Sequence, residues 1–108
     1  MRVMGDEDML VPKTKRPIVM IIGSCKFLDK MKEIGWEYTR AGWIVMLPNE
    51  RPENAADVDS IILENIGKSK IDLADEVIVC DVNGYIGEST TKELEYAKSK
   101  DKKIRYLV

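Results

Sequence analysis

The chain has 108 residues, enough for one domain built on a single sheet but not for two hydrophobic cores. With 44% hydrophobic residues, 33% charged residues and a formal net charge of -2, the composition is typical of a globular domain and argues against a nucleic acid polymer as partner. No apolar run reaches the roughly 18 residues of a membrane span and no signal peptide is recognisable, so we expect a cytoplasmic protein with no membrane partner.

The first part of the chain predicts an arm, a strand and a helix. Residues 1–16 show no sustained hydrophobic period and are predicted to form a loosely ordered arm before a domain that covers residues 17–108. The apolar, β-branched run at residues 17–22 predicts a strand that is buried on both faces. Apolar residues spaced by three and four between positions 27 and 41 then predict an amphipathic helix.

The remaining elements continue the alternation of strand and helix. Apolar runs predict three more strands, at residues 43–47, 76–81 and 103–107. Helical spacing after position 58 predicts a second helix that Gly67 closes, and residues 89–100 predict a third. This pattern predicts an α/β fold, a three-layer, doubly wound (Rossmann-like or flavodoxin-like) sandwich with a four-stranded parallel sheet in the order 2-1-3-4.

Polar residues follow the first predicted strand, where doubly wound sheets bind ligands. Gly23 and Ser24 stand at a strand-to-helix turn, whose N–H groups and hydroxyl can bind a phosphate, and Lys26 adds positive charge. The Gly-Ser pair is neither a Walker loop nor a dinucleotide fingerprint. A tight turn and an exposed lysine therefore explain these residues as well as a ligand site does.

The loop after the third predicted strand and the helix that follows it hold most of the candidates, namely Asp81, Tyr85, Gly87, Glu88, Ser89, Thr90 and Glu93. Glu93 has two interpretations. In one, Thr90 and Glu93 form a capping box in which each side chain bonds the other residue's backbone, worth about 1 kcal/mol. In the other, the Glu93 carboxylate faces the crevice and takes part in chemistry. The two interpretations do not exclude each other.

The chain lacks the residues that several common catalytic mechanisms need. There is no histidine, which excludes a Ser-His-Asp site, and the two cysteines, Cys25 and Cys80, are too few for a closed zinc site. Both are interpreted as small buried hydrophobic residues. We therefore expect no metal and no cofactor, and any acid–base chemistry must come from carboxylates, lysine, tyrosine or cysteine.

The succession of "IVMIIGS", "LADEVIVCDV", "GEST" and "KELEYA" resembles the nucleoside 2-deoxyribosyltransferase superfamily, which includes deoxynucleoside-monophosphate glycosidases. The resemblance covers about residues 17–108, and its specific part is a glycine-containing turn and then a Glu-Leu pair two residues before Tyr-Ala, on the helix after the third predicted strand. It implies that Glu93 attacks the anomeric carbon of a 2-deoxyribosyl group. It also implies that Gly23 and Ser24 lie near the sugar or its phosphate. Ser89 and Thr90 match the small hydroxyl residues that the superfamily has before the nucleophile.

Two positions depart from the pattern of the superfamily. Relatives that use a phosphate usually have an arginine in the first loop, where this chain has Lys26. Relatives also have an acidic residue near the end of their second helix, for which this chain offers only Asp72 as a counterpart. Members often complete their sites with a neighbouring subunit, so the resemblance also implies a homo-oligomer.

Cleavage of an N-glycosidic bond passes through an oxocarbenium-like centre, which one carboxylate can capture while a second acid assists the leaving base. The expected nucleophile is Glu93, the expected second acid is Asp81 or Glu88, and Tyr85 would orient either acid or stack on the base. Each of these residues also has a structural alternative. Asp81 can form a hydrogen bond within its own loop, and the charge of Glu88 can stabilise the start of the helix. Tyr85 can be a partly buried side chain that anchors its loop.

Three functions stay open from the sequence. The first is cleavage or 2-deoxyribosyl transfer at the N-glycosidic bond of a nucleoside or nucleotide. The second is a non-catalytic module that binds a nucleotide-like small molecule in the same crevice. The third is a small oligomerising Rossmann-like domain without chemistry.

Overall fold

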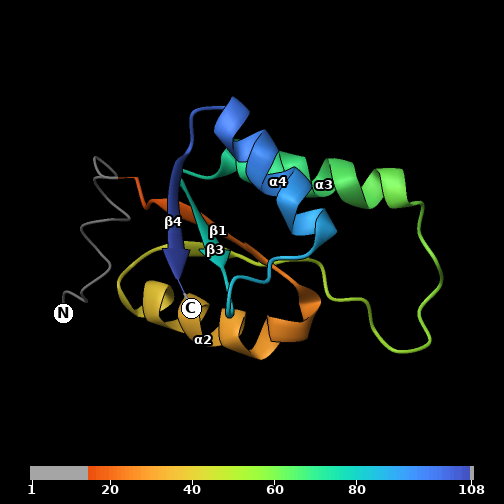
Figure 1. Cartoon of the computed structure of the whole chain (residues 1–108). Helices are drawn as coiled ribbons and strands as arrows, with labels where there is room; N and C mark the ends of the chain where they lie inside the picture. The colour runs from red at the N-terminus through yellow and green to blue at the C-terminus, as the bar shows by residue number, and fades with distance from the viewer. Residues whose placement is uncertain (1–14, 108) are drawn as a thin grey trace.

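Figure 1 shows the computed structural model of the chain, which describes residues 15–107. Residues 1–14, which make up most of the predicted arm, and residue 108 lie outside the described part. The elements, in chain order, are β1 (Ile18–Gly23), a short 3-10 helix (Cys25–Phe27), α2 (Leu28–Arg40), β2 (Ile44–Met46), α3 (Ser60–Leu73), β3 (Glu76–Cys80), α4 (Glu88–Ser99) and β4 (Lys103–Leu107).

The four strands form one parallel sheet in the order β2-β1-β3-β4, which confirms the predicted fold class and strand order. The two central strands pair along their length, from Val19 beside Glu76 to Gly23 beside Cys80. All five residues of β3 and five of the six in β1 are buried. Continuous apolar, β-branched runs form such strands because both faces of the sheet are covered by helices.

The helices cover the sheet in two layers, with α2 on one face and α3 and α4 on the other (Figure 1). Alternate residues of β1 divide between the two resulting cores. Val19 and Ile21 pack with Met31 under α2, whereas Met20 and Ile22 pack with residues of α3 and α4. Each large apolar side chain buried in this way contributes about 1.5–3 kcal/mol, so the two cores fix the layers that surround the site.

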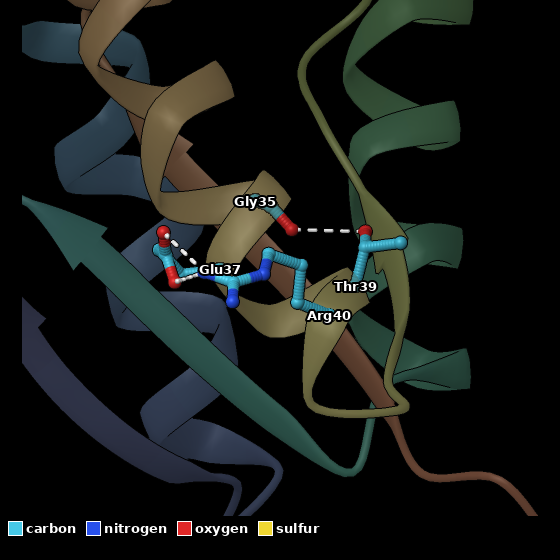
Figure 2. A network of polar contacts seen from close by, with 4 residues as sticks. All are labelled: Gly35, Glu37, Thr39 and Arg40. Atoms are coloured by element: carbon cyan, nitrogen blue, oxygen red, sulfur yellow. Dashed lines mark hydrogen bonds and ion pairs between the residues drawn. The ribbon is translucent and has the colours of Figure 1, made fainter.

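The end of α2 follows the prediction, because Gly42 with a φ of 96° turns the chain toward β2. Figure 2 shows the polar contacts of the last turns. The Thr39 hydroxyl donates to the Gly35 carbonyl at 2.9 Å, and Arg40 pairs with Glu37 at 3.1 Å. Both contacts lie within the helix, and an exposed ion pair of this kind contributes only about 0.3–0.5 kcal/mol.

The course of α3 corrects the prediction that Gly67 closes the second helix. The helix continues through Gly67 to Leu73 and ends where the backbone of Ala74 is extended, with a ψ of 144°. Lys102 Nζ donates to the carbonyls of Asp72 and Ala74 at this end, at 3.0 and 2.8 Å. Gly67 is buried inside the helix because a side chain of α4 occupies the space beside it. Within residues 15–107, no helix has the length and apolar character to cross a membrane.

Candidate functional site

The carboxyl ends of β1 and β3 open into a cavity of about 560 Å³, a volume within the range of small-molecule sites. One wall comes from the turn after β1, a second from residues 48 and 49 after β2, and a third from α3. The loop before α4 and the first turns of that helix complete it. The cavity therefore lies at the edge of the sheet where the sequence predicts a ligand.

Eight of the ten predicted site residues line this cavity: Gly23, Ser24, Tyr85, Gly87, Glu88, Ser89, Thr90 and Glu93. The other two lie outside the lining. Lys26 is exposed, with its Nζ 4.7 Å from the ring centroid of Tyr85. Asp81 directly follows β3, where its N–H donates to the carbonyl of Leu107 and one of its carboxylate oxygens is buried without a hydrogen-bond partner.

Asp72, the counterpart of the superfamily's second acidic residue, also lies outside the cavity lining. It is exposed on α3, and its Oδ1 accepts a hydrogen bond from the Tyr96 hydroxyl at 2.7 Å. The structure thus brings together the predicted nucleophile and the loop residues, but not the two aspartates. Among the residues of the described chain, no group of three or more metal-ligating side chains is assembled.

The turn after β1 is held by packing and by a cap. A Cβ atom on Gly23 would lie 3.0 Å from both Cys80 Cβ and Met31 Sδ, so only glycine fits this crossing of β1, β3 and α2 without displacing a neighbour. Ser24 caps the short 3-10 helix, with its Oγ accepting the N–H of Lys26 at 3.3 Å. These contacts place Gly23 and Ser24 at the cavity wall.

The start of α4 shows that the predicted capping box is wrong. The N-cap is Gly87, whose φ of 77° turns the chain into the helix before Thr90 is reached, and no side chain caps the helix. Thr90 is buried and Glu93 lies a full turn further along the helix. Glu88, Ser89 and Thr90 instead bring the first turn of α4, the positive end of its dipole, to the cavity.

Glu93, which has no capping role, extends across to α3. Its Oε2 lies 2.7 Å from the position of a Cβ on Gly67, and within residues 15–107 no donor forms a hydrogen bond with the carboxylate. Burial raises the pKa of Glu93 above its usual value, and the nearby charge of Lys70 partly offsets this. The cavity therefore holds a carboxylate that is partly desolvated and free of any structural hydrogen bond.

The cavity also contains Lys70, which no sequence pattern predicts as a site residue. Its Nζ donates to the Leu47 carbonyl at 2.7 Å and to Asn49 Oδ1 at 2.8 Å. Burial lowers the pKa of Lys70, and the charge of Glu93 acts in the opposite direction. The sequence does place Gly67 and Lys70 three residues apart, on one face of a helix, but a glycine after an apolar period predicts a helix end instead.

No family model matches the sequence, and no curated protein matches it. Among solved structures, a similar one is the 2-desoxiribosyltransferase from Leishmania mexicana, with a TM-score of 0.58 and 19% sequence identity. The chain shares its fold. The similarity covers 84% of this chain and 63% of that one, so the chain spans less than two thirds of the length of this neighbour.

The fold shared with the 2-desoxiribosyltransferase and the cavity at its sheet edge are separate observations. At 19% identity the comparison speaks for the fold alone. What the arrangement can do chemically follows from the cavity itself. A carboxylate held beside one cation, next to a helix N-terminus and several hydroxyl groups, suits capture of an electrophilic carbon while polar ligand groups are bound.

Proposed function

We propose that the chain cleaves or transfers the N-glycosidic bond of a 2-deoxynucleoside or its nucleotide, with Glu93 as the nucleophile. The observation that carries this proposal is the state of the Glu93 carboxylate, which lines the cavity without serving as a helix cap. The motif around Glu93 and the fold of the structural neighbour support the same reading. Glu88 is proposed as the second acid, because it lines the cavity and Asp81 does not.

The proposed reaction has two steps. A carboxylate oxygen of Glu93 forms a bond to C1′ as the C1′–N bond breaks. The electron pair of the C1′–N bond leaves with the base, and the base takes a proton from Glu88. Water or a second base then attacks C1′, breaks the ester to Glu93 and returns a proton to Glu88. Water gives hydrolysis, and a second base gives transfer.

The test is release of free base from a panel of deoxynucleosides and their 5′-monophosphates. Glu93→Gln should lower turnover by about three orders of magnitude or more, since an amide does not capture C1′. The matched control is Glu95→Gln, because Glu95 is exposed on the same helix and lies outside the cavity lining. Mass spectrometry of acid-quenched wild type should also find one deoxyribosyl group on Glu93. Absence of base release by the wild type from every panel member would contradict the proposal.

A module that binds a nucleotide-like ligand without turnover is the second candidate. It is favoured by the two predicted aspartates, Asp72 and Asp81, which lie outside the cavity and leave fewer acids for catalysis. In that case, members of the same panel should raise the melting temperature while every glycosidic bond stays intact. Glu93→Gln should then change affinity only.

We further propose that the chain forms a homo-oligomer through α3. Ile62, Leu63 and Ile66 form an exposed apolar stripe on this helix, because Ile66 lies four residues after Ile62 and three after Leu63. Ile62 is 50% and Ile66 is 40% exposed. Leu63 also lines the cavity, so a second copy on this helix would extend the cavity wall. A two-fold contact suits such a stripe, because the same patch on both copies meets itself. A cytoplasmic location stays an expectation from the sequence.

A further inference from the structure

The ammonium group of Lys70 joins two walls of the cavity. Lys70 lies on α3, and both of its acceptors, the Leu47 carbonyl and Asn49 Oδ1, belong to the segment that leaves β2. From residue 47 to residue 59 this segment forms no helix or strand. Two of the three N–H donors of Lys70 thus fix the start of a long connection against α3.

The same ammonium group brings positive charge to the side of α3 where Glu93 lies. The Glu93 carboxylate packs against Gly67, three residues before Lys70, and all three residues line the cavity. The charge of Lys70 accordingly lowers the pKa of Glu93, against the larger effect of burial. Four other charged side chains line the cavity, Glu64 and Lys68 from α3 and Glu88 and Lys92 from α4. Lys68 pairs with Glu64 at 3.5 Å. The ammonium group of Lys70 is instead fixed by its two hydrogen bonds to the segment after β2.

We propose that Lys70 is a positioning residue of this cavity, whose single ammonium group both fixes the segment after β2 and faces the carboxylate of Glu93. Removal of Lys70 would release residues 47–49 from α3 and leave the Glu93 carboxylate with burial but no compensating charge. The first consequence follows from the two hydrogen bonds of Lys70, and the second from the position of the Glu93 carboxylate beside Gly67, three residues before Lys70 on α3. Only the effect on turnover rests on the proposed function.

The first test follows the Glu93 carboxyl group by NMR in the ligand-free protein. In Lys70→Met the pKa of Glu93 should rise above that of the wild type, whereas Lys70→Arg should keep it close to the wild type because the charge is retained. Lys98→Met is the matched control, since Lys98 is exposed on α4 and lies outside the cavity lining. An unchanged Glu93 titration in folded Lys70→Met would overturn the electrostatic half of the proposal.

A reciprocal measurement does not depend on whether Lys70→Met folds. The charge of Glu93 raises the pKa of Lys70, so Glu93→Gln should lower the pKa of Lys70, and Glu95→Gln should leave it unchanged. A Lys70 pKa that stays the same in Glu93→Gln would contradict the pairing of the two groups.

The second test is hydrogen exchange of the connection after β2. The amide of Ala55, whose N–H donates to the Pro52 carbonyl at 3.1 Å within this connection, should exchange faster in Lys70→Met than in the wild type, while the amides of β1 and β3 should keep their protection. Lys98→Met should match the wild type throughout. Equal exchange of the Ala55 amide in Lys70→Met and wild type would overturn the anchoring half.

The effect on turnover is read last. Glu93 attacks as the ionised carboxylate, so Lys70→Met should shift the acid limb of the pH–rate profile to higher pH. Lys70→Arg retains the charge and should leave the acid limb at its wild-type position. Wild type without turnover would count against the proposed function and leave the titration and exchange results standing. If the Glu93 pKa rises in Lys70→Met but the acid limb does not move, Lys70 does not influence turnover through the ionisation of Glu93.

Discussion

Glu93 Oε2 lies 2.7 Å from the position that a Cβ atom on Gly67 would take. Glycine inside a helix costs about 1 kcal/mol relative to alanine, so a glycine in the middle of α3 calls for a physical reason. The Glu93 carboxylate is that reason, because only a residue without a side chain lets the carboxylate approach the backbone of α3 this closely. The clash in Gly67→Ala would fall on the end of a flexible side chain, so the fold should adapt while the carboxylate moves.

Gly67→Ala should therefore melt close to the wild-type temperature and lose about tenfold or more in base release, since a displaced nucleophile reacts slowly. Ser69→Ala, at an exposed position of the same helix, is the control for helix propensity and should keep full activity. Loss of the fold in Gly67→Ala would mean that the glycine serves packing. Full activity would mean that the observed position of Glu93 is not required.

The exposed stripe on α3 predicts the assembly state. Light scattering at micromolar concentration should give a mass well above the 12.3 kDa of one chain. Ile62→Lys should shift the mass toward one chain, because a charge at the centre of an apolar contact is costly to bury. Ile44→Lys, at a half-exposed position on the edge strand, is the control and should keep the wild-type mass. A wild type that scatters as a monomer would rule out a shared cavity.

The sheet could be predicted from the sequence because its information is local. Unbroken apolar runs specify strands that are buried on both faces. The observed bounds of β1 and β3 differ from the predicted bounds by no more than one residue at each end. The parallel order follows from the helices between them. For the same reason the cavity was expected at the ends of β1 and β3.

The site was harder to predict because its contacts join distant segments. Lys70 binds residues 21 and 23 positions away, and no local pattern indicates those partners. The sequence predicts a helix end at Gly67, because the carboxylate that explains this glycine lies on another helix. The capping box failed for a local reason, since the positive φ of Gly87 starts α4 earlier than the Thr90 hydroxyl suggests.

Lys26 should act through Tyr85 rather than through a bound phosphate. Its Nζ lies 4.7 Å from the Tyr85 ring centroid, and Phe27 packs on the same ring edge-on at 6.1 Å. An exposed cation–π contact contributes about 0.5–1 kcal/mol, so Lys26→Met should weaken ligand binding by less than about tenfold. The ratio of rates for a 5′-monophosphate and its nucleoside should not change. A selective loss of the monophosphate would instead assign Lys26 to the phosphate.

The stability of the fold should report the state of Glu93 without any substrate. Burial raises the Glu93 pKa in the folded chain above its unfolded value, so the folded state binds the proton more tightly. As pH rises from below the unfolded pKa through the folded pKa, this group therefore lowers stability, and the cost is fully present once both states are ionised. Other carboxylates also titrate in this range, so the quantity to measure is the difference in melting temperature between wild type and Glu93→Gln. That difference should shift in favour of the wild type on acidification, and Glu95→Gln should show no such trend. A pH-independent difference would show that the Glu93 carboxylate is as well solvated in the folded chain as in the unfolded one.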